Sequence, residues 1–210
     1  MLDKENIKIY LNTPPRTGSH FLLFNIITNL DIDQSSIAKT HATKYFIKQK
    51  TITILRDPKE CIISLLSMLR TNRNYPVSFP INAIMENDIS NISYKSASII
   101  EQMKYYKDFY IKCQESIKDI VPFTFEQVTD SQELCNKVIS EYFNIDYRKY
   151  PKKYIFDGRK NVLLTSKNAK NYEEINNNIS IFDNDFFYIY KEYHKLLSLI
   201  KIRQKDLGMI

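Results

Sequence analysis

The chain has 210 residues, of which 43% are hydrophobic and 13% aromatic, so it can bury a globular core and is too apolar for a disordered protein. Its net charge of +6 is a modest excess, which fits a basic surface or an anionic ligand. The first residues lack a signal-peptide pattern, no apolar run approaches the ~20 residues of a membrane span, and three widely spaced cysteines make no zinc-binding pattern. We therefore expect a cytoplasmic protein without a membrane span or bound metal.

Predicted strands and helices alternate in the first third of the chain. Strands are expected at 7–12, 37–41 and 51–55, with a buried helix at 20–30. The third strand, TITIL, is rich in β-branched residues. A second helix should run from Pro58 to about Leu69, because Asp57 suits the N-cap, Pro58 the first helical position and Glu60 the third position of a capping box.

The remaining two thirds contain longer elements. We expect a loop at 71–93, an amphipathic helix at 94–117, a strand at 121–128, a helix at 131–143, a polar segment at 151–180 and a final helix at about 185–205. In the 94–117 helix, apolar side chains recur at steps of three and four and should face the core. His194, in the final helix, is expected at the surface.

This alternation predicts an α/β fold with a single domain over residues 1–210. The central sheet should be mainly parallel and flanked by helices on both faces. Ligands of such folds bind beyond the carboxyl ends of the strands. The segments 13–20 and 56–60, which join strands to helices, are therefore the expected location of the chemistry.

The stretch LNTPPRTGSHFLLFNII, residues 11–27, predicts an anion site where a strand turns into a helix. The first N–H groups of a helix lack intrahelical partners and carry partial positive charge. Gly18 lets an anion approach the backbone, Thr17 and Ser19 offer hydroxyl donors, and Arg16 offers a forked cation. The stretch lacks the GxxxxGK[ST] pattern of a Walker A loop, so it is a different kind of anion loop.

Two further segments carry candidate residues. Arg56 ends the TITIL strand and Ser64 lies eight residues further along, so together they can hold a second anion. A purely local pairing of Arg56 with Asp57 or Glu60 is the alternative. His41, in the sequence KTH, lies near a predicted strand end, where a general base is useful, and imidazole titrates near neutral pH.

Taken in order, these segments resemble the sulfotransferases that use 3′-phosphoadenosine 5′-phosphosulfate. PPRTGSHFL resembles the 5′-phosphosulfate loop of that family, KTH its histidine strand, RDPKECIIS its 3′-phosphate motif, and FTFEQV a later strand. The resemblance covers residues 7–70 and, more loosely, 121–143. It implies a P-loop-like architecture and metal-independent transfer of a sulfonyl group to an acceptor hydroxyl, with adenosine 3′,5′-bisphosphate as the product.

The resemblance also implies a role for each matching residue. Arg16 would contact the phosphosulfate and the leaving oxygen, and His41 would accept the proton of the acceptor hydroxyl. The implied donor-binding residues are Arg16, Thr17, Gly18, Ser19 and His20 in the phosphate loop, Phe21 near the adenine, and Arg56 and Ser64 at the 3′-phosphate.

The chain departs from the family pattern at three points. His20 stands where the family usually has Thr or Ser. The C-terminal segment that closes over the 3′-phosphate has no clean copy, and within GRKNVLLTSKNAKNY we prefer Ser166 and Lys167 among the candidates, which also include Arg159, Lys160 and Lys170. Because some members use a carboxylate as the base, Glu86 or Asp88 is an alternative to His41. We expect segment 71–93 to bind the acceptor and segment 151–180 to close over the donor or the acceptor.

Two other functions remain open from the sequence. A kinase-like phosphotransferase is disfavoured because the lysine–hydroxyl pair of a P-loop and an obvious magnesium carboxylate are missing. A non-catalytic basic binding protein, for example one for nucleic acid, is disfavoured because no such binding signature is present. We therefore expect a hydroxyl acceptor as the partner and no nucleic acid.

Overall fold

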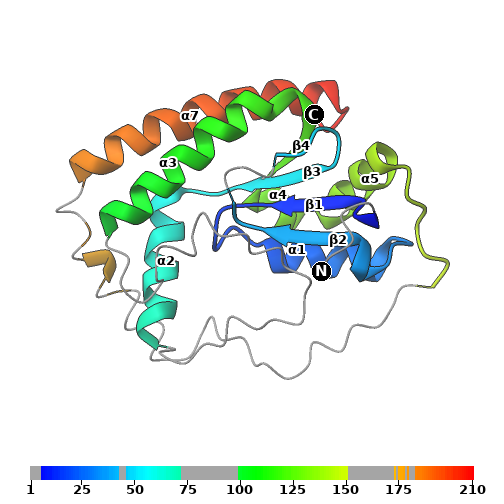
Figure 1. Cartoon of the computed structure of the whole chain (residues 1–210), viewed down its shortest axis with the longest axis horizontal. Coiled ribbons are helices and arrows are strands. Elements are labelled where there is room, and N and C mark those ends of the chain that lie inside the picture. Colours follow the sequence, from blue (N-terminus) through cyan, green and yellow to red (C-terminus); the bar gives the residue numbers. More distant parts are fainter. Residues whose placement is uncertain are drawn as a thin grey trace.

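The computed structural model describes residues 6–42, 46–71, 99–150, 173, 175–177, 179 and 183–210. Its centre is a four-stranded sheet with the order β2-β1-β3-β4, in which every strand pairing is parallel (Figure 1). The strands are β1 (Ile9–Asn12), β2 (Ile37–Thr40), β3 (Thr51–Leu55) and β4 (Ile120–Thr124). The predicted α/β fold with a central parallel sheet is confirmed.

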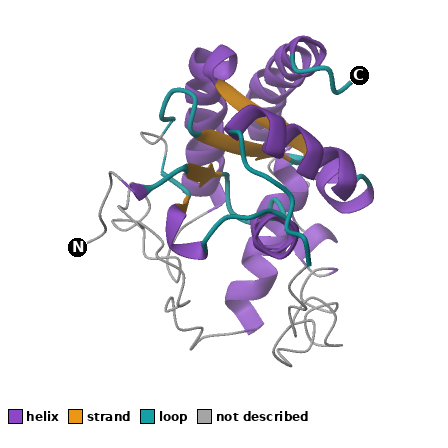
Figure 2. Cartoon of the chain, turned by 90° about the vertical axis from the view of Figure 1, so that its right-hand side faces the viewer, coloured by secondary structure: helices purple, strands orange, loops and turns teal. Residues whose placement is uncertain are grey.

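Helices lie on both sides of the strands (Figure 2). The helices are α1 (Ser19–Asn29), α2 (Pro58–Thr71), α3 (Ile99–Ser116), α4 (Phe125–Asp130), α5 (Gln132–Phe143) and α7 (Asp183–Asp206), with short 3-10 turns η2 (Gln34–Ser36) and η3 (Ile117–Asp119). Helices α1 and α5 cover one face, whereas α2, α3 and α7 cover the other. Within the described residues, none of these helices combines the length and apolarity needed to cross a membrane.

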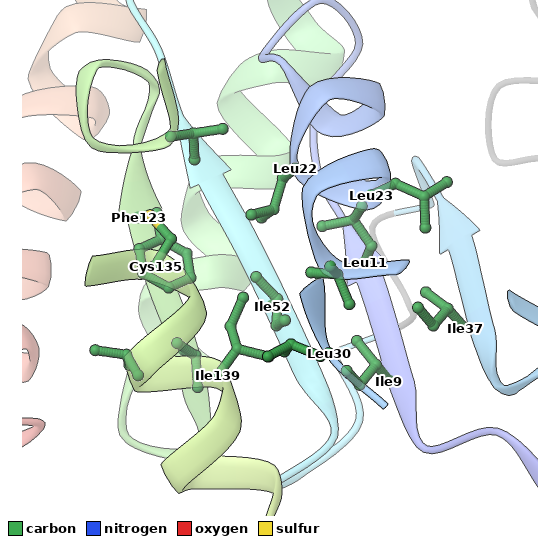
Figure 3. Close-up of a cluster of buried hydrophobic side chains, with 14 of the residues drawn as sticks. Ile9, Leu11, Leu22, Leu23, Leu30, Ile37, Ile52, Phe123, Cys135 and Ile139 are labelled. Carbon is green, nitrogen blue, oxygen red and sulfur yellow. The ribbon is translucent and has the colours of Figure 1, made fainter. Parts of the chain in front are cut away.

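One core fills the space between the sheet and the α1–α5 layer. Ile9 and Leu11 of β1 and Ile52 of β3 meet Leu22 of α1 and Ile139 of α5 there (Figure 3). Successive side chains of a strand point to opposite faces, so Tyr10 lies on the other side of the sheet, against Ala38. Because both faces are covered, the strands are apolar over most of their length instead of alternating strictly.

The second core joins α2, α3 and α7, and α3 runs along α7 (Figure 1). The face of α3 that the periodicity predicts is buried, including Met103, Tyr106, Tyr110, Cys113 and Ile117. The cysteines are all unpaired and buried. His194 of α7 is exposed, as expected.

The strand order places a topological switch point between β1 and β3. From β1 the chain passes through α1 to β2 on one side, whereas β3 lies on the other side of β1. Helices α1 and α2 therefore leave from opposite faces of the sheet, and folds of this kind bind ligands beyond the carboxyl ends of the two strands at such a point. The segments that follow them begin at Thr13 and Arg56, as the sequence predicted for the site.

The prediction of a strand over 121–128 is wrong in its second half. Strand β4 ends at Thr124, and FEQV begins helix α4. The Thr124 side chain accepts a hydrogen bond from the Gln127 N–H (3.3 Å), and the Gln127 side chain accepts one from the Thr124 N–H (2.9 Å). This reciprocal capping box turns the chain into a helix although its next residue is a strand-favouring phenylalanine.

We expect Thr124→Val to lower the free energy of unfolding by about 1 kcal/mol, because it removes this N-cap. Urea denaturation measures the effect. Thr129→Val is the matched control within the same helix: its hydroxyl donates to Phe125 and Glu126 carbonyls and caps nothing. A change of about 0.5 kcal/mol or less is expected there. Equal losses in the two variants would contradict the cap assignment.

Candidate functional site

The loop between β1 and α1 makes a tight turn with two left-handed residues. Arg16 has a φ of 64° and Gly18 a φ of 86°. The Thr17 hydroxyl donates to the Pro14 carbonyl (2.9 Å), which closes the turn. Thr17 is fully buried, so its side chain holds the loop together and the hydroxyl is engaged within the protein. The turn sets the direction in which α1 begins.

No side chain caps the N-terminus of α1. Gly18 is the N-cap, and no acidic residue lies in the first turn. The first bond of the helix runs from the Leu22 N–H to the Gly18 carbonyl (3.1 Å), so the N–H groups of Ser19, His20 and Phe21 are not used by the helix itself. Their partial positive charge favours a phosphate or sulfate at this point.

Two sequence motifs meet beside this helix end. The Arg16 side chain donates through Nε to Ser64 Oγ of α2 (3.0 Å), and Arg56 donates through Nη1 to the Arg16 carbonyl (2.9 Å). Arg56 also lies 3.8 Å from the Glu60 carboxylate, so the predicted local pairing exists as well. Asp57 caps α2 by accepting from the Glu60 N–H (3.1 Å), as predicted. Two basic side chains from separate loops thus converge next to a helix N-terminus that no side chain caps.

Phe125, for which the sequence indicated no role, lies between these parts of the site. The Arg56 guanidinium stacks 4.2 Å from the centre of its ring. On the other side, a Cβ atom at Gly18 would lie 3.1 Å from two ring carbons. Phe125 therefore supports both the phosphate loop and Arg56. The capping box in TFEQ, which the sequence prediction did not include, begins α4 at Phe125 and so places this ring at the end of β4.

Strand β2 contributes a buried lysine that the sequence analysis did not assign. Lys39 is only 7% exposed, and its Nζ lies 3.0 Å from Nδ1 and 3.2 Å from Nε2 of His20. Burial and the nearby Arg16 charge lower the pKa of Lys39 to about 7. The signal was available, because a lysine within an otherwise buried four-residue strand needs a reason to be there.

His41 follows β2 and is oriented by the backbone. Its Nδ1 lies 2.5 Å from the Thr13 carbonyl, so Nδ1 carries the hydrogen and Nε2 keeps the lone pair. Burial and the Lys39 charge lower the pKa of His41 to about 3, against the opposing effect of the Thr13 hydrogen bond. Nearby, the fully buried Thr13 hydroxyl has no hydrogen-bond partner within the described part of the chain.

Helix α3 holds all three site loops through tyrosine hydroxyls. Tyr106 donates to the Pro15 carbonyl (2.8 Å), Tyr110 to the Arg56 carbonyl (3.2 Å) and Tyr105 to the His41 carbonyl (2.5 Å). These carbonyls belong to segments that follow β1, β3 and β2, respectively. One helix therefore fixes the relative positions of loops that lie far apart in the sequence.

The structure brings most of the predicted site residues to one edge of the sheet. They are Arg16, Thr17, Gly18, Ser19, His20, His41, Arg56 and Ser64. Phe21 lies in the first turn of α1 with 43% of its surface exposed, and its place beside an adenine stays a prediction. Several candidates lie outside the described residues: Ser166, Lys167 and the other basic candidates of segment 151–180, and the alternative bases Glu86 and Asp88.

No known family model matches this chain, and comparisons with curated proteins and with solved structures likewise gave no match.

We expect Tyr106→Phe to lower the free energy of unfolding by about 1–3 kcal/mol, because it leaves the buried Pro15 carbonyl without its donor. Chemical denaturation measures the loss. Tyr147→Phe is the control, since that tyrosine is 51% exposed, and it should change stability by about 0.5 kcal/mol or less. If Tyr106→Phe behaved like the control, the hydroxyl would not be holding the loop.

Gly18→Ala should cost more stability than Gly208→Ala. Both glycines have positive φ, where a Cβ costs about 1–2 kcal/mol, but only Gly18 has neighbours within 4 Å of the added atom. The difference between the two variants in urea denaturation therefore reports the contact with Phe125. Equal losses would show that Phe125 does not press on the loop.

Proposed function

We propose that this protein is a sulfotransferase that takes a sulfonyl group from 3′-phosphoadenosine 5′-phosphosulfate and transfers it to a hydroxyl acceptor in the cytoplasm. One observation carries the proposal: Arg56 and Ser64 of one motif each contact Arg16 of the other motif, at the start of α1, which no side chain caps. That arrangement suits a ligand with two phosphate-like groups, one at each motif.

The charge balance of the site supports an anionic ligand. Lys39 is buried, and within the described residues no carboxylate lies within ion-pair distance of its Nζ. Buried charges in proteins are normally paired. Arg56 uses Nη1 for the Arg16 carbonyl, and its Nη2 lies 3.8 Å from the Glu60 carboxylate, so its remaining N–H groups are the ones that could bind a phosphate. The residues present therefore fit a phosphosulfate at the α1 end and a 3′-phosphate at Arg56 and Ser64.

The proposed mechanism depends on fixed charges and one oriented imidazole. The donor, when bound, supplies the activated sulfonyl group. Arg16, Lys39 and the first N–H groups of α1 stabilise negative charge on the leaving phosphate, and each such group typically contributes about 10²–10³ in rate. His41 directs its Nδ1–H to Thr13, so Nε2 can accept the proton of the acceptor hydroxyl. The low pKa of His41, about 3, keeps this nitrogen unprotonated at neutral pH but also makes it a weak base.

The proposal is tested by the thermal stability of the chain with adenosine 3′,5′-bisphosphate, compared with 5′-AMP, ADP and magnesium-ATP. At about 100 times its Kd, the bisphosphate should stabilise the fold by about 2.7 kcal/mol without metal. Arg56→Ala should lose this ligand-induced shift, measured against its own unliganded melting temperature. Lys59→Ala is the matched control, because Lys59 also lies at the start of α2 but pairs with Asp183.

Other ligand patterns would contradict this function. A larger shift with magnesium-ATP would favour a kinase-like phosphotransferase. Steeply salt-dependent binding of an oligonucleotide, without a bisphosphate shift, would favour a nucleic-acid-binding protein. If the bisphosphate still stabilises Arg56→Ala, the chain binds the nucleotide, but Arg56 does not form the proposed 3′-phosphate site.

A further inference from the structure

The pair formed by Lys39 and His20 is unusual because both partners are bases. The Lys39 Nζ lies within hydrogen-bond distance of the imidazole nitrogens of His20, and Lys39 is almost completely buried. Because the two distances, to Nδ1 and to Nε2, are nearly equal, 3.0 and 3.2 Å, the amine lies against the imidazole ring and not on the lone pair of one nitrogen. A charged Lys39 at this distance disfavours protonation of the ring, so the ring is neutral in this contact. The residue that makes this pair, His20, stands where the sulfotransferases that the sequence resembles usually have Thr or Ser.

Among the described residues, Arg16 and His41 interact electrostatically with this pair. Arg16 acts on it from the phosphate loop, and His41 follows Lys39 at the end of β2. From α3, Tyr105 donates its hydroxyl to the His41 carbonyl. Within the described residues, burial and the Arg16 charge both oppose the protonation of Lys39. An anion placed at the N-terminus of α1 would reverse this local balance.

We propose that binding of the anionic donor draws one proton from solvent onto the Lys39 amine, which lies against the neutral imidazole of His20. This inference rests on the proposed function, since it takes the donor anion as the ligand. In the ligand-free protein, the amine avoids the cost of a second buried cation beside Arg16. In the bound protein, the ammonium adds a charge that the anion stabilises. His20 is thus a positioning residue, and Lys39 contacts the ligand.

The direction of the pH dependence follows from these states. Burial and Arg16 lower the pKa of Lys39 to about 7, and burial with Lys39 and Arg16 lowers that of His20 to about 3. Above pH 7 the free amine is mostly neutral, whereas a bound anion favours its charged form. Binding then takes up a proton, so affinity falls as the pH rises. Phosphate groups, with a second pKa near 6, are already ionised there and do not obscure the effect.

The size of the effect is set by proton linkage. If one proton is taken up, the association constant of the bisphosphate should fall by about tenfold per pH unit above the pKa of the free amine. A site built only from arginines and backbone N–H groups would show no such dependence, because arginine stays charged throughout this range. The slope therefore separates a site with a titrating lysine from a site with permanent charges.

Isothermal titration calorimetry with adenosine 3′,5′-bisphosphate at about pH 8, in HEPES and in Tris, counts the protons, because the two buffers release protons with different enthalpies. The wild type should take up about one proton. Lys39→Met should bind more weakly and take up none, whereas Lys48→Met, an exposed lysine whose side chain is 73% accessible, should behave like the wild type. His20→Asn should keep the uptake and bind more weakly, because the amine has lost the ring that it lies against.

Several results would overturn the inference. The first is binding of the bisphosphate to the wild type without proton uptake. The second is proton uptake that persists in Lys39→Met. The third is proton uptake that is lost in His20→Asn but kept in Lys39→Met. The first needs no variant, so the inference is testable even if a substitution at Lys39 prevents folding. The proposed function would still stand in these cases, because the nucleotide binds.

A second probe, inorganic sulfate, separates failure of the proposed nucleotide function from failure of the proton-uptake inference. If the bisphosphate does not bind, inorganic sulfate is titrated in the same two buffers. Sulfate binding with proton uptake would support the anion-linked protonation of Lys39 while the proposed nucleotide function fails. Sulfate binding without proton uptake, or binding of neither probe, would overturn the inference together with the proposed function.

Discussion

The site depends on how the buried carbonyl groups at one edge of the sheet are satisfied. Parallel strands end side by side, so the loops that follow them bring polar backbone into a place that water reaches poorly. Three tyrosine hydroxyls of α3 donate hydrogen bonds to the backbone carbonyls of Pro15, His41 and Arg56. A hydroxyl on a rigid ring has few ways to reach its partner. The same contacts that keep these carbonyls paired therefore fix the distances between the anion loop, the histidine and the second arginine.

Electrostatics explains why these loops need such support. Arg16, Arg56 and Lys39 lie at one edge of the sheet, and the helix N-terminus adds partial positive charge. Like charges at close range repel, so the fold holds them by other means. Arg56 stacks on Phe125 and Lys39 rests against neutral His20. A bound anion at this edge would offset the repulsion between these charges.

Much of this arrangement could be predicted from local patterns. The strands over 7–12 and 51–55 and the helix that begins at Pro58 are set by periodicity and by caps, which act over a few residues. The error over 121–128 had a local cause too, because the capping pair Thr124 and Gln127 outweighs the strand propensity of the phenylalanine between them. What local patterns could not predict is the partner of each side chain. Ser64 accepts from Arg16, 48 residues away, and no spacing rule connects the two.

The sequence by itself determined the order of strands and helices except for α4, the glycine turn before α1 and the set of residue types able to bind an anion, because these properties depend on neighbours along the chain. Only the tertiary structure decided that Lys39 is buried against His20, that Phe125 lies between Gly18 and Arg56, and that α3 holds three separate loops. Contacts of this kind depend on the sheet order β2-β1-β3-β4, which brings distant segments to one edge. The burial that they create shifts the pKa of Lys39, and burial is a property of the folded chain and not of any residue in it.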